Sequence, residues 1–250
     1  MTTLLAGLVT FVFTTVLTIA GVGAAFILIP VFVAMGIDIH VAMATALLLN
    51  AIAMAVASVR FVRLGLVQWS TALPLLVVAS ALSPVGAWVS QGLDREPLLW
   101  MFVGFLLFAA GMMLFYRPKA REVAASRGWL LGVGVLVGSV AGFVGGLLGV
   151  GGGNIIVPAL VALGVEPKRA SATTAFVVVF SSLSGFFGHA TLTGMDLPLL
   201  GATAAGSVAA AALGAWLMTN RLKGKQVKLL IGIVLLAVAG KIVWNLTMGT

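Results

Sequence analysis

A glycine-rich turn in the second half of the sequence is the feature best suited to chemistry. Residues 149–153 read Gly-Val-Gly-Gly-Gly and lead directly into Asn154 and a short apolar stretch. Such a turn leaves backbone N–H groups free at the start of a helix, where the positive end of the helix dipole also attracts anions. We therefore predict an oxyanion site whose members in this half are Gly151, Gly152, Gly153 and Asn154.

A nucleotide-binding role and a packing role are the alternatives for this turn. A dinucleotide-binding fingerprint requires a strand before the glycines and an acidic residue for the ribose downstream, and this apolar context offers neither. Close helix packing explains the glycines of the preceding segment. These recur every four residues as Gly134, Gly138, Gly142 and Gly146. Packing on that helix does not explain the run that follows, so the anion site is the preferred interpretation.

The first half carries a related turn, Gly21-Val22-Gly23, which is followed by Ala24-Ala25. Hydroxyl and amide side chains stand within the apolar segments that follow the turns, and they would supply further donors to an anion. A Thr hydroxyl commonly bonds to its own helix instead, and an embedded Asn commonly bonds to a neighbouring helix. The predicted site accordingly also includes Gly23, Ala24, Thr45, Asn50, Thr173 and Thr174.

The composition places the chain in a membrane. Of its 250 residues, 62% are hydrophobic and 8% are charged, and apolar runs of about 20 residues recur throughout. All six acidic residues fall in connections between these runs, so no embedded carboxylate is available to bind a cation or relay protons. The chain has no Cys, no metal-ligand spacing and no set of Ser, His and acid. We predict that it is not an enzyme and uses no cofactor or metal.

Ten apolar segments are predicted to be helical. Eight of them are long enough to cross or nearly cross a bilayer, whereas the second and seventh are too short for a hydrocarbon core of about 30 Å. We expect each short segment to form a re-entrant hairpin with the helix before it, with a glycine turn at the tip. The segments are approximately 4–20, 24–35, 40–60, 70–90, 97–116, 129–148, 154–164, 170–187, 197–218 and 227–246.

The two halves of the chain repeat. At an offset of 128 residues the matches include Gly21 with Gly149, Pro30 with Pro158 and Trp88 with Trp216. Because each repeat has five segments, an odd number, the second repeat should lie inverted relative to the first. The predicted fold is therefore all-α, with inverted repeats at 1–116 and 129–250 joined by a cytoplasmic linker at 117–128.

The basic residues indicate the orientation. If successive connections alternate between the two sides, all Lys and Arg residues except Arg95 and Lys241 fall on one side. Under the positive-inside rule that side is the cytoplasm, which leaves both termini outside it and explains the net charge of +8 without nucleic acid. The same alternation puts His40 and His189 on the outer side, where we expect solvated loop residues. We predict a multi-pass protein of the inner membrane.

The second turn and its surroundings resemble a known family. The motif of the sulfite exporter TauE/SafE family of membrane permeases is similar to residues 149–153, Pro158, 163–167 and 170–174, and the similarity continues through both halves. The first turn departs from this motif, because Ala24-Ala25 stands where the second turn has Gly152-Gly153. The resemblance implies transport of small sulfur-containing anions such as sulfite, thiosulfate or organosulfonates.

Together these features predict a transporter that works by alternating access and holds its anion at the helix N-termini of the glycine turns. Its partners are then the small anionic substrate and the lipid bilayer, and a homo-oligomer stays open as an alternative to a monomer. A passive anion channel, a transporter of a non-sulfur carboxylate, and a membrane scaffold or sensor are the competing interpretations. The identity of the anion, the direction of transport and the coupling ion also stay open.

Overall fold

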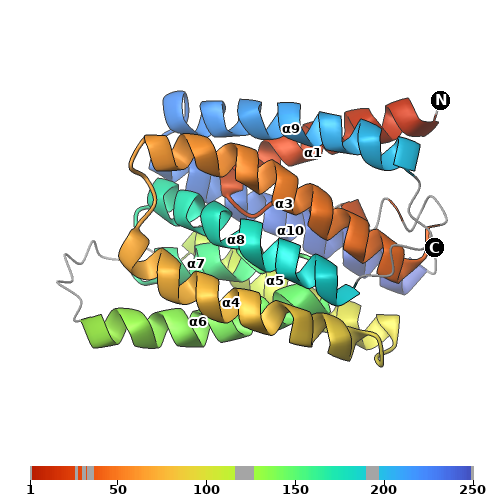
Figure 1. The fold of residues 1–250 in the computed structure, drawn as a ribbon, viewed down its shortest axis with the longest axis horizontal. Coiled ribbons are helices and arrows are strands. Elements are labelled where there is room, and N and C mark those ends of the chain that lie inside the picture. Colours follow the sequence, from red (N-terminus) through yellow and green to blue (C-terminus); the bar gives the residue numbers. More distant parts are fainter. Residues whose placement is uncertain are drawn as a thin grey trace.

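The computed structural model describes residues 2–25, 28–29, 32, 37–115, 127–189 and 197–248. Within these ranges the chain is helical apart from its connections and contains no strand, which confirms the predicted all-α class for the described residues. The helices are α1 (Thr2–Ala20), α3 (Ile39–Arg63), α4 (Trp69–Ser90), α5 (Arg95–Phe115), α6 (Arg127–Leu147), α7 (Gly153–Ala162), α8 (Pro167–His189), α9 (Leu197–Asn220) and α10 (Gly224–Met248) (Figure 1).

The helices differ in whether they can cross a membrane. The predicted second segment, 24–35, lies largely outside the described residues, as does most of the 117–128 linker. Helix α7 has ten residues, which at about 1.5 Å per residue cover only about half of a bilayer core. Among the described residues, four helices are long and apolar enough to cross by length and composition, namely α3, α4, α8 and the 200–220 part of α9. The described apolar stretches of the other long helices have 10–17 residues and are shorter than a membrane span.

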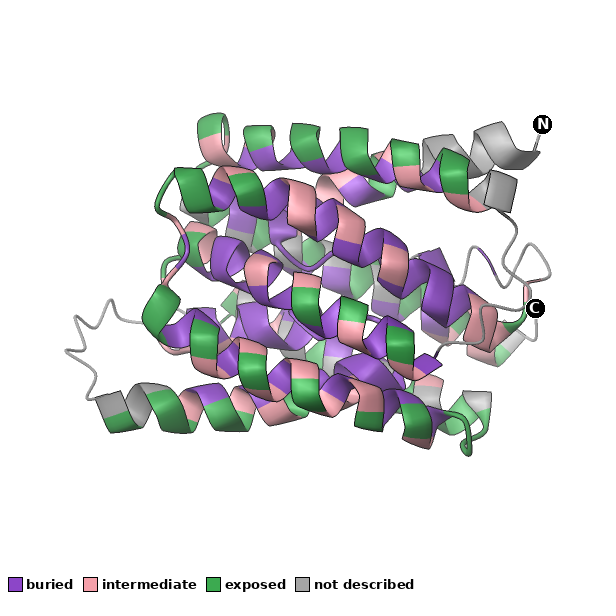
Figure 2. Cartoon of the chain, viewed as in Figure 1, coloured by how far each residue is buried: buried purple, intermediate pink, exposed green. Residues whose placement is uncertain are grey.

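Helices α3 and α8 form the centre of the bundle and pack against each other. Within their most apolar windows 61% and 67% of the residues are buried, compared with 33% for α4 and 33% for α9. Helix α4 packs on α8 and α9 packs on α3, while α6 and α1 pack on α4 and α9 respectively. Buried residues therefore line the interior of the bundle, and the outer helices carry exposed faces (Figure 2).

Small residues allow α4 and α6 to approach closely. The four-residue glycine repeat of α6 lies against α4, and a Cβ atom added at any of its four positions would approach α4 atoms more closely than ordinary van der Waals contact. Close approach of backbones through small residues is a common basis of helix association in membranes. The packing role expected for this repeat is thus confirmed. The nearest residues are Pro74, Val78, Ala79 and Ser83, opposite Gly134, Gly138, Gly142 and Gly146 respectively.

The crossing of α4 with α6 has a counterpart in the crossing of α9 with α1. Gly86 of α4 lies against the carbonyl group of Phe143 in α6, and Gly214 of α9 lies against the carbonyl group of Thr15 in α1. Gly214 follows Gly86 by 128 residues, and Phe143 follows Thr15 by the same number. The two crossings are therefore built from corresponding residues of the two halves.

Replacing Gly142 with Leu is expected to destabilise the folded protein strongly. The added side chain would run into the backbone of Ala79, and overpacking of this kind costs about 1–3 kcal/mol or more. Gly132→Leu is the matched control, because nothing lies within 4 Å of a Cβ atom added at that position of the same helix. Thermal denaturation in detergent should show a lower midpoint for Gly142→Leu than for Gly132→Leu, and equal midpoints would contradict the close crossing.

Basic side chains gather at one end of the bundle around the C-terminal end of α9. Arg60 Nε donates to Thr219 Oγ1 at 2.9 Å, and Lys168 Nζ donates to the carbonyl oxygen of Thr219 at 3.4 Å. The Arg221 guanidinium lies 5.5 Å from the centre of the Trp216 ring. Cations at a helix C-terminus interact favourably with the helix dipole. The start of α1 and the end of α10 lie at the opposite end of the bundle (Figure 1).

Candidate functional site

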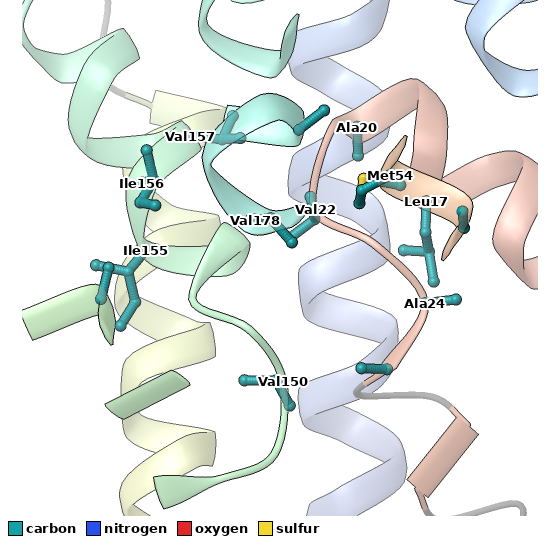
Figure 3. Close-up of a cluster of buried hydrophobic side chains, with 14 of the residues drawn as sticks. Leu17, Ala20, Val22, Ala24, Met54, Val150, Ile155, Ile156, Val157 and Val178 are labelled. Carbon is teal, nitrogen blue, oxygen red and sulfur yellow. The ribbon is translucent and has the colours of Figure 1, made fainter. Parts of the chain in front are cut away.

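The two glycine turns meet inside the bundle. A Cβ atom added to Gly153 would lie 2.6 Å from the carbonyl oxygen of Val22, so the second turn lies against the backbone of the first. Apolar side chains of both turns are buried there, with Val22 and Ala24 on one turn and Val150 on the other (Figure 3). The structure thus brings together two segments that are far apart in the sequence.

The backbone of the turns explains their glycines. Gly152, the N-cap of α7, has a φ angle of +78°, whereas its counterpart in the first turn, Ala24, has no positive φ. L side chains rarely adopt this left-handed region. The two turns therefore have the same sign of φ at their first two glycines. They differ at the next position with a counterpart, Gly152 in the second turn and Ala24 in the first. The matching φ angles are +73°, +79°, +68° and +76° at Gly21, Gly23, Gly149 and Gly151.

Asn50 of α3 lies between the turns. Its Nδ2 donates to Ser182 Oγ of α8 at 2.9 Å, and both residues are fully buried. A Cβ atom added to Gly23 would collide with the Asn50 amide oxygen, and one added to Gly151 would collide with Ser182 Oγ. The interhelical hydrogen bond, which the sequence left open for Asn50, is therefore present. Its amide oxygen has no partner among the described residues.

Helix α8 holds both turns through serine hydroxyls. Ser171 Oγ donates to the carbonyl oxygen of Ala20, where α1 ends, and Ser181 Oγ donates to the carbonyl oxygen of Gly151, both at 2.9 Å. Ser171 was weighed with the threonines as a hydroxyl for the anion site, whereas Ser181 is not among the residues predicted for the site. The sequence signal was the group of serines at 181, 182 and 184 in an apolar helix. Their partners depend on the packing of α8, which the sequence pattern does not show.

The N-terminal end of α7 presents unpaired donors. Its first backbone hydrogen bonds run from the amides of Ile155 and Ile156 to the carbonyl oxygen of Gly152, at 3.0 and 3.2 Å. The amides of Gly152, Gly153 and Asn154 have no acceptor among the described residues. The Asn154 side chain is 1% exposed, and neither its Oδ1 nor its Nδ2 has a partner there. Buried polar groups are nearly always hydrogen-bonded, so this end of α7 is a place where a polar ligand would be stabilised.

The space beside Gly152 and Gly153 is occupied by protein. A Cβ atom added to Gly152 would collide with the carbonyl oxygen of Ala141 in α6, and one added to Gly153 would press against Val22. Close packing therefore explains why glycine stands at both positions, in addition to the left-handed φ angle of Gly152. The amide nitrogen of Gly152 itself lies against Gly145 of α6, so a ligand at this end of α7 would meet the amides of Gly153 and Asn154.

The three threonines predicted for the site lie in different surroundings. Thr173 Oγ1 accepts from the backbone N–H of Gln68 at 3.0 Å, so it anchors the connection between α3 and α4. Thr174 Oγ1 is buried and has no partner in the described part of the chain. Thr45 is buried on α3. No hydrogen bond joins any of them to either turn within the described residues.

Sequence relatives point to one family. A profile of the family described as Sulfite exporter TauE/SafE matches residues 6–242. The probable membrane transporter protein YunE of Bacillus subtilis is 27% identical over 169 residues, which cover 60% of this chain and 61% of that protein. Sulfite exporter TauE/SafE family protein 3 of Arabidopsis thaliana is 46% identical over 72 residues, 26% of this chain and 15% of that protein. The probable membrane transporter protein y4hK of Sinorhizobium fredii is 24% identical over 210 residues, 80% of this chain and 81% of that protein.

The chain spans less than two thirds of the length of the Bacillus and Arabidopsis relatives. No solved structure matches it. The family profile nevertheless covers nearly the whole chain, including both glycine turns and every described helix in part or in full. The relatives with the longer matched stretches carry names of membrane transporters, in keeping with the apolar helices described above. The chain belongs to the sulfite exporter TauE/SafE family, a family of membrane transporters rather than enzymes.

Proposed function

We propose that this protein carries small sulfur-containing oxyanions across the inner membrane by alternating access. The observation that carries the proposal is the buried N-terminal end of α7, where three backbone amides and the Asn154 side chain lack partners among the described residues. Donors gathered at the positive end of a helix dipole suit an oxyanion, whose several oxygens accept hydrogen bonds at once. Sulfur is inferred from the family, which is described as a sulfite exporter.

An inverted repeat accounts for the packing of the helices. The pair α4 and α6 has its counterpart in α9 and α1, and the pair α4 and α8 has its counterpart in α9 and α3. The pairs α3 with α8 and α5 with α10 each join corresponding helices of the two halves. A twofold axis between α3 and α8 would produce this pattern. We therefore assign 1–116 and 129–250 as inverted repeats, with each turn at the tip of a re-entrant hairpin.

The charges support both the anion and the orientation. The basic cluster around Thr219 marks the cytoplasmic end under the positive-inside rule, so the start of α1 and the end of α10 lie outside. A positively charged end also raises the local concentration of anions. Among the described residues no Asp or Glu is buried, so no negative charge within the bundle opposes a bound anion.

The short α7 and its turn supply the moving part. The turn is held by Ser181 of α8 and faces the first turn across the Asn50 side chain. We propose that the hairpins tilt against the central pair of α3 and α8, and that this motion opens the N-terminal end of α7 to each side of the membrane in turn. Because the anion binds to backbone amides of the turn itself, its binding and the motion of the turn are coupled.

Counterflow in proteoliposomes tests the carrier against a passive channel. Unlabelled thiosulfate trapped inside should make labelled thiosulfate accumulate transiently above its equilibrium level, because one site faces the two sides alternately. Sulfite, taurine, sulfoacetate and acetate complete the panel. A response to acetate alone would favour a carboxylate transporter over the proposed substrate class. Flux that does not saturate, together with voltage-driven single-channel currents, would contradict the carrier.

A further inference from the structure

The two histidines of the chain, one from each half, lie together in the structure. His40 is the second residue of α3 and His189 is the last residue of α8. Their ring centres are 6.5 Å apart, with the ring planes tilted by 35°. We expected both to be solvated loop residues, and for His189 this is wrong, because it belongs to α8 and is only 2% exposed. This histidine pair lies at the end of the bundle away from the basic cluster.

The hydrogen bonding of His189 leaves one ring nitrogen without a hydrogen. Its Nε2 lies 2.8 Å from the carbonyl oxygen of Gly146. A carbonyl oxygen can only accept, so Nε2 carries the hydrogen, and Nδ1 of the neutral ring is a bare acceptor. His189 Nδ1 and His40 Nδ1 are both buried, and neither has a partner in the described part of the chain. Histidine is the side chain that changes charge most readily near neutral pH.

This pair is directly connected to the second glycine turn. The carbonyl oxygen of Gly146 accepts from His189 Nε2 and also from the amide of Gly149, at 3.1 Å, where the turn begins. A positively charged imidazole donates a stronger hydrogen bond than a neutral one. A proton on His189 would therefore strengthen its hold on Gly146 and compete with the bond that closes the turn. The histidine and the first amide of the turn therefore share one acceptor.

The charged groups near the pair lie on the elements packed around the ends of α3 and α8. On α3 the nearest is Asp38, whose carboxylate caps the helix by accepting from the amides of His40 and Val41. Helices α4 and α6 lie beside the end of α8, with Pro84 next to Gly188, and their described residues there carry no titratable group. Lys241 of α10 is exposed, and α1 contains no titratable side chain. The connection after α4 also lies here, because Gln91 Nε2 donates to the carbonyl oxygen of Gly188 at 3.3 Å. It carries the exposed Asp94 and leads to the exposed Glu96. Among these groups, His189 is the one that is both buried and bonded to the α6 end at Gly146.

We propose that His189 and His40 form the proton-binding site that couples transport to the proton gradient. The inference rests on the proposed transport function and names its coupling ion. The sequence offered no embedded carboxylate for this task, and the structure supplies a buried histidine instead. Protonation from the outer side biases the second turn through Gly146, while the anion binds at the other end of the same turn.

Proton binding itself can be measured without any substrate. The chain contains only two histidines, so NMR spectra of histidine-labelled protein in detergent report the pair directly, and His40→Gln assigns the signals. We expect the His189 ring to show a protonation transition whose midpoint moves when His40 is replaced. A His189 ring with no protonation transition, or with a midpoint that does not change in His40→Gln, would overturn the proposal.

Coupling is then tested by transport. In proteoliposomes with a pH gradient, the wild type should accumulate labelled thiosulfate, and a trapped pH dye should report protons moving with it. His189→Gln keeps a donor for Gly146 but cannot take up a proton, and the ratio of gradient-driven to equal-pH transport should fall about tenfold. Lys241→Gln is the control, because it removes an exposed titratable group and should keep the wild-type ratio.

The outcomes separate this inference from the proposed function. Counterflow of thiosulfate without proton movement in the wild type would overturn proton coupling and leave the carrier standing. No counterflow with any anion of the panel would overturn the proposed function, and the NMR titration would still decide whether the histidines bind protons as a pair. A His189→Gln protein that keeps the wild-type ratio would also overturn the coupling role. His189→Leu, which removes the donor as well, shows by its thermal midpoint whether the Gly146 bond alone stabilises the fold.

Discussion

Asn154→Asp is expected to abolish oxyanion binding. The substitution keeps the size of the side chain and places a negative charge beside the free amides at the start of α7, where Asn154 is buried without a partner among the described residues. Two unit charges of the same sign 4 Å apart repel by about 4 kcal/mol at an effective dielectric constant of about 20. The Kd should therefore rise at least about a hundredfold. Isothermal titration of the purified protein with thiosulfate or sulfite measures it.

Asn154→Ala completes this series. Loss of one hydrogen-bond donor should weaken binding by about 1 kcal/mol, or about fivefold, without adding a charge. The expected order of affinity is wild type, then Ala, then Asp. Since the Asn154 side chain has no partner among the described residues, Asn154→Ala removes no known internal hydrogen bond, and its thermal midpoint in the absence of anion should stay close to the wild type. Equal anion affinity in all three proteins would remove Asn154 from the site.

Gly23→Ala is expected to disrupt the paired turns and unfold the protein readily. Gly23 has a φ angle of +79°, and a Cβ atom there would collide with the amide oxygen of Asn50. The left-handed conformation costs an L residue about 1–2 kcal/mol, and overpacking adds about 1–3 kcal/mol. Displacement of Asn50 would also break its hydrogen bond to Ser182. Thermal denaturation and size-exclusion behaviour in detergent should both show the loss.

Two controls separate the causes. Gly65→Ala carries the strain of a φ angle of +64° in open space, because nothing lies within 4 Å of its added Cβ atom. Gly65→Ala should therefore lower the free energy of unfolding only by the cost of the left-handed backbone conformation. Combining Gly23→Ala with Asn50→Ala removes the colliding amide and should restore part of the lost stability. If Gly23→Ala alone were as stable as Gly65→Ala, the contact between the first turn and Asn50 would be wrong.

The positions of the helices were largely predictable from local features. The seventh helix was expected at 154–164 and runs from Gly153 to Ala162, because the left-handed Gly152 ends the turn and caps the helix. The eighth was expected at 170–187 and extends at both ends, from Pro167 to His189. Proline suits the first position of a helix, where its missing N–H is not needed, and hydropathy alone does not mark such an end.

The histidines show where local context fails. A polar residue at the end of an apolar segment is usually solvated, and His40 is indeed only partly buried. His189 is buried because the α6 end at Gly146 lies against its ring and Gly188 lies against α4. The burial of a residue near a helix end depends on which other helices pack beside it. The spacing of residues within α8 does not show this.

The sequence by itself determined that this chain belongs in a membrane, the order of its helices and the places where its backbone must turn. These properties depend on composition and on spacing along the chain, and glycine at a left-handed position is a local requirement. Only the tertiary structure decided which polar groups meet, such as Asn50 with Ser182 and Gly151 with Ser181. A polar side chain in an apolar helix can bond to many different partners until the helices pack. Whether its donor then stays unpaired within the described residues, as at Asn154, depends on the whole fold.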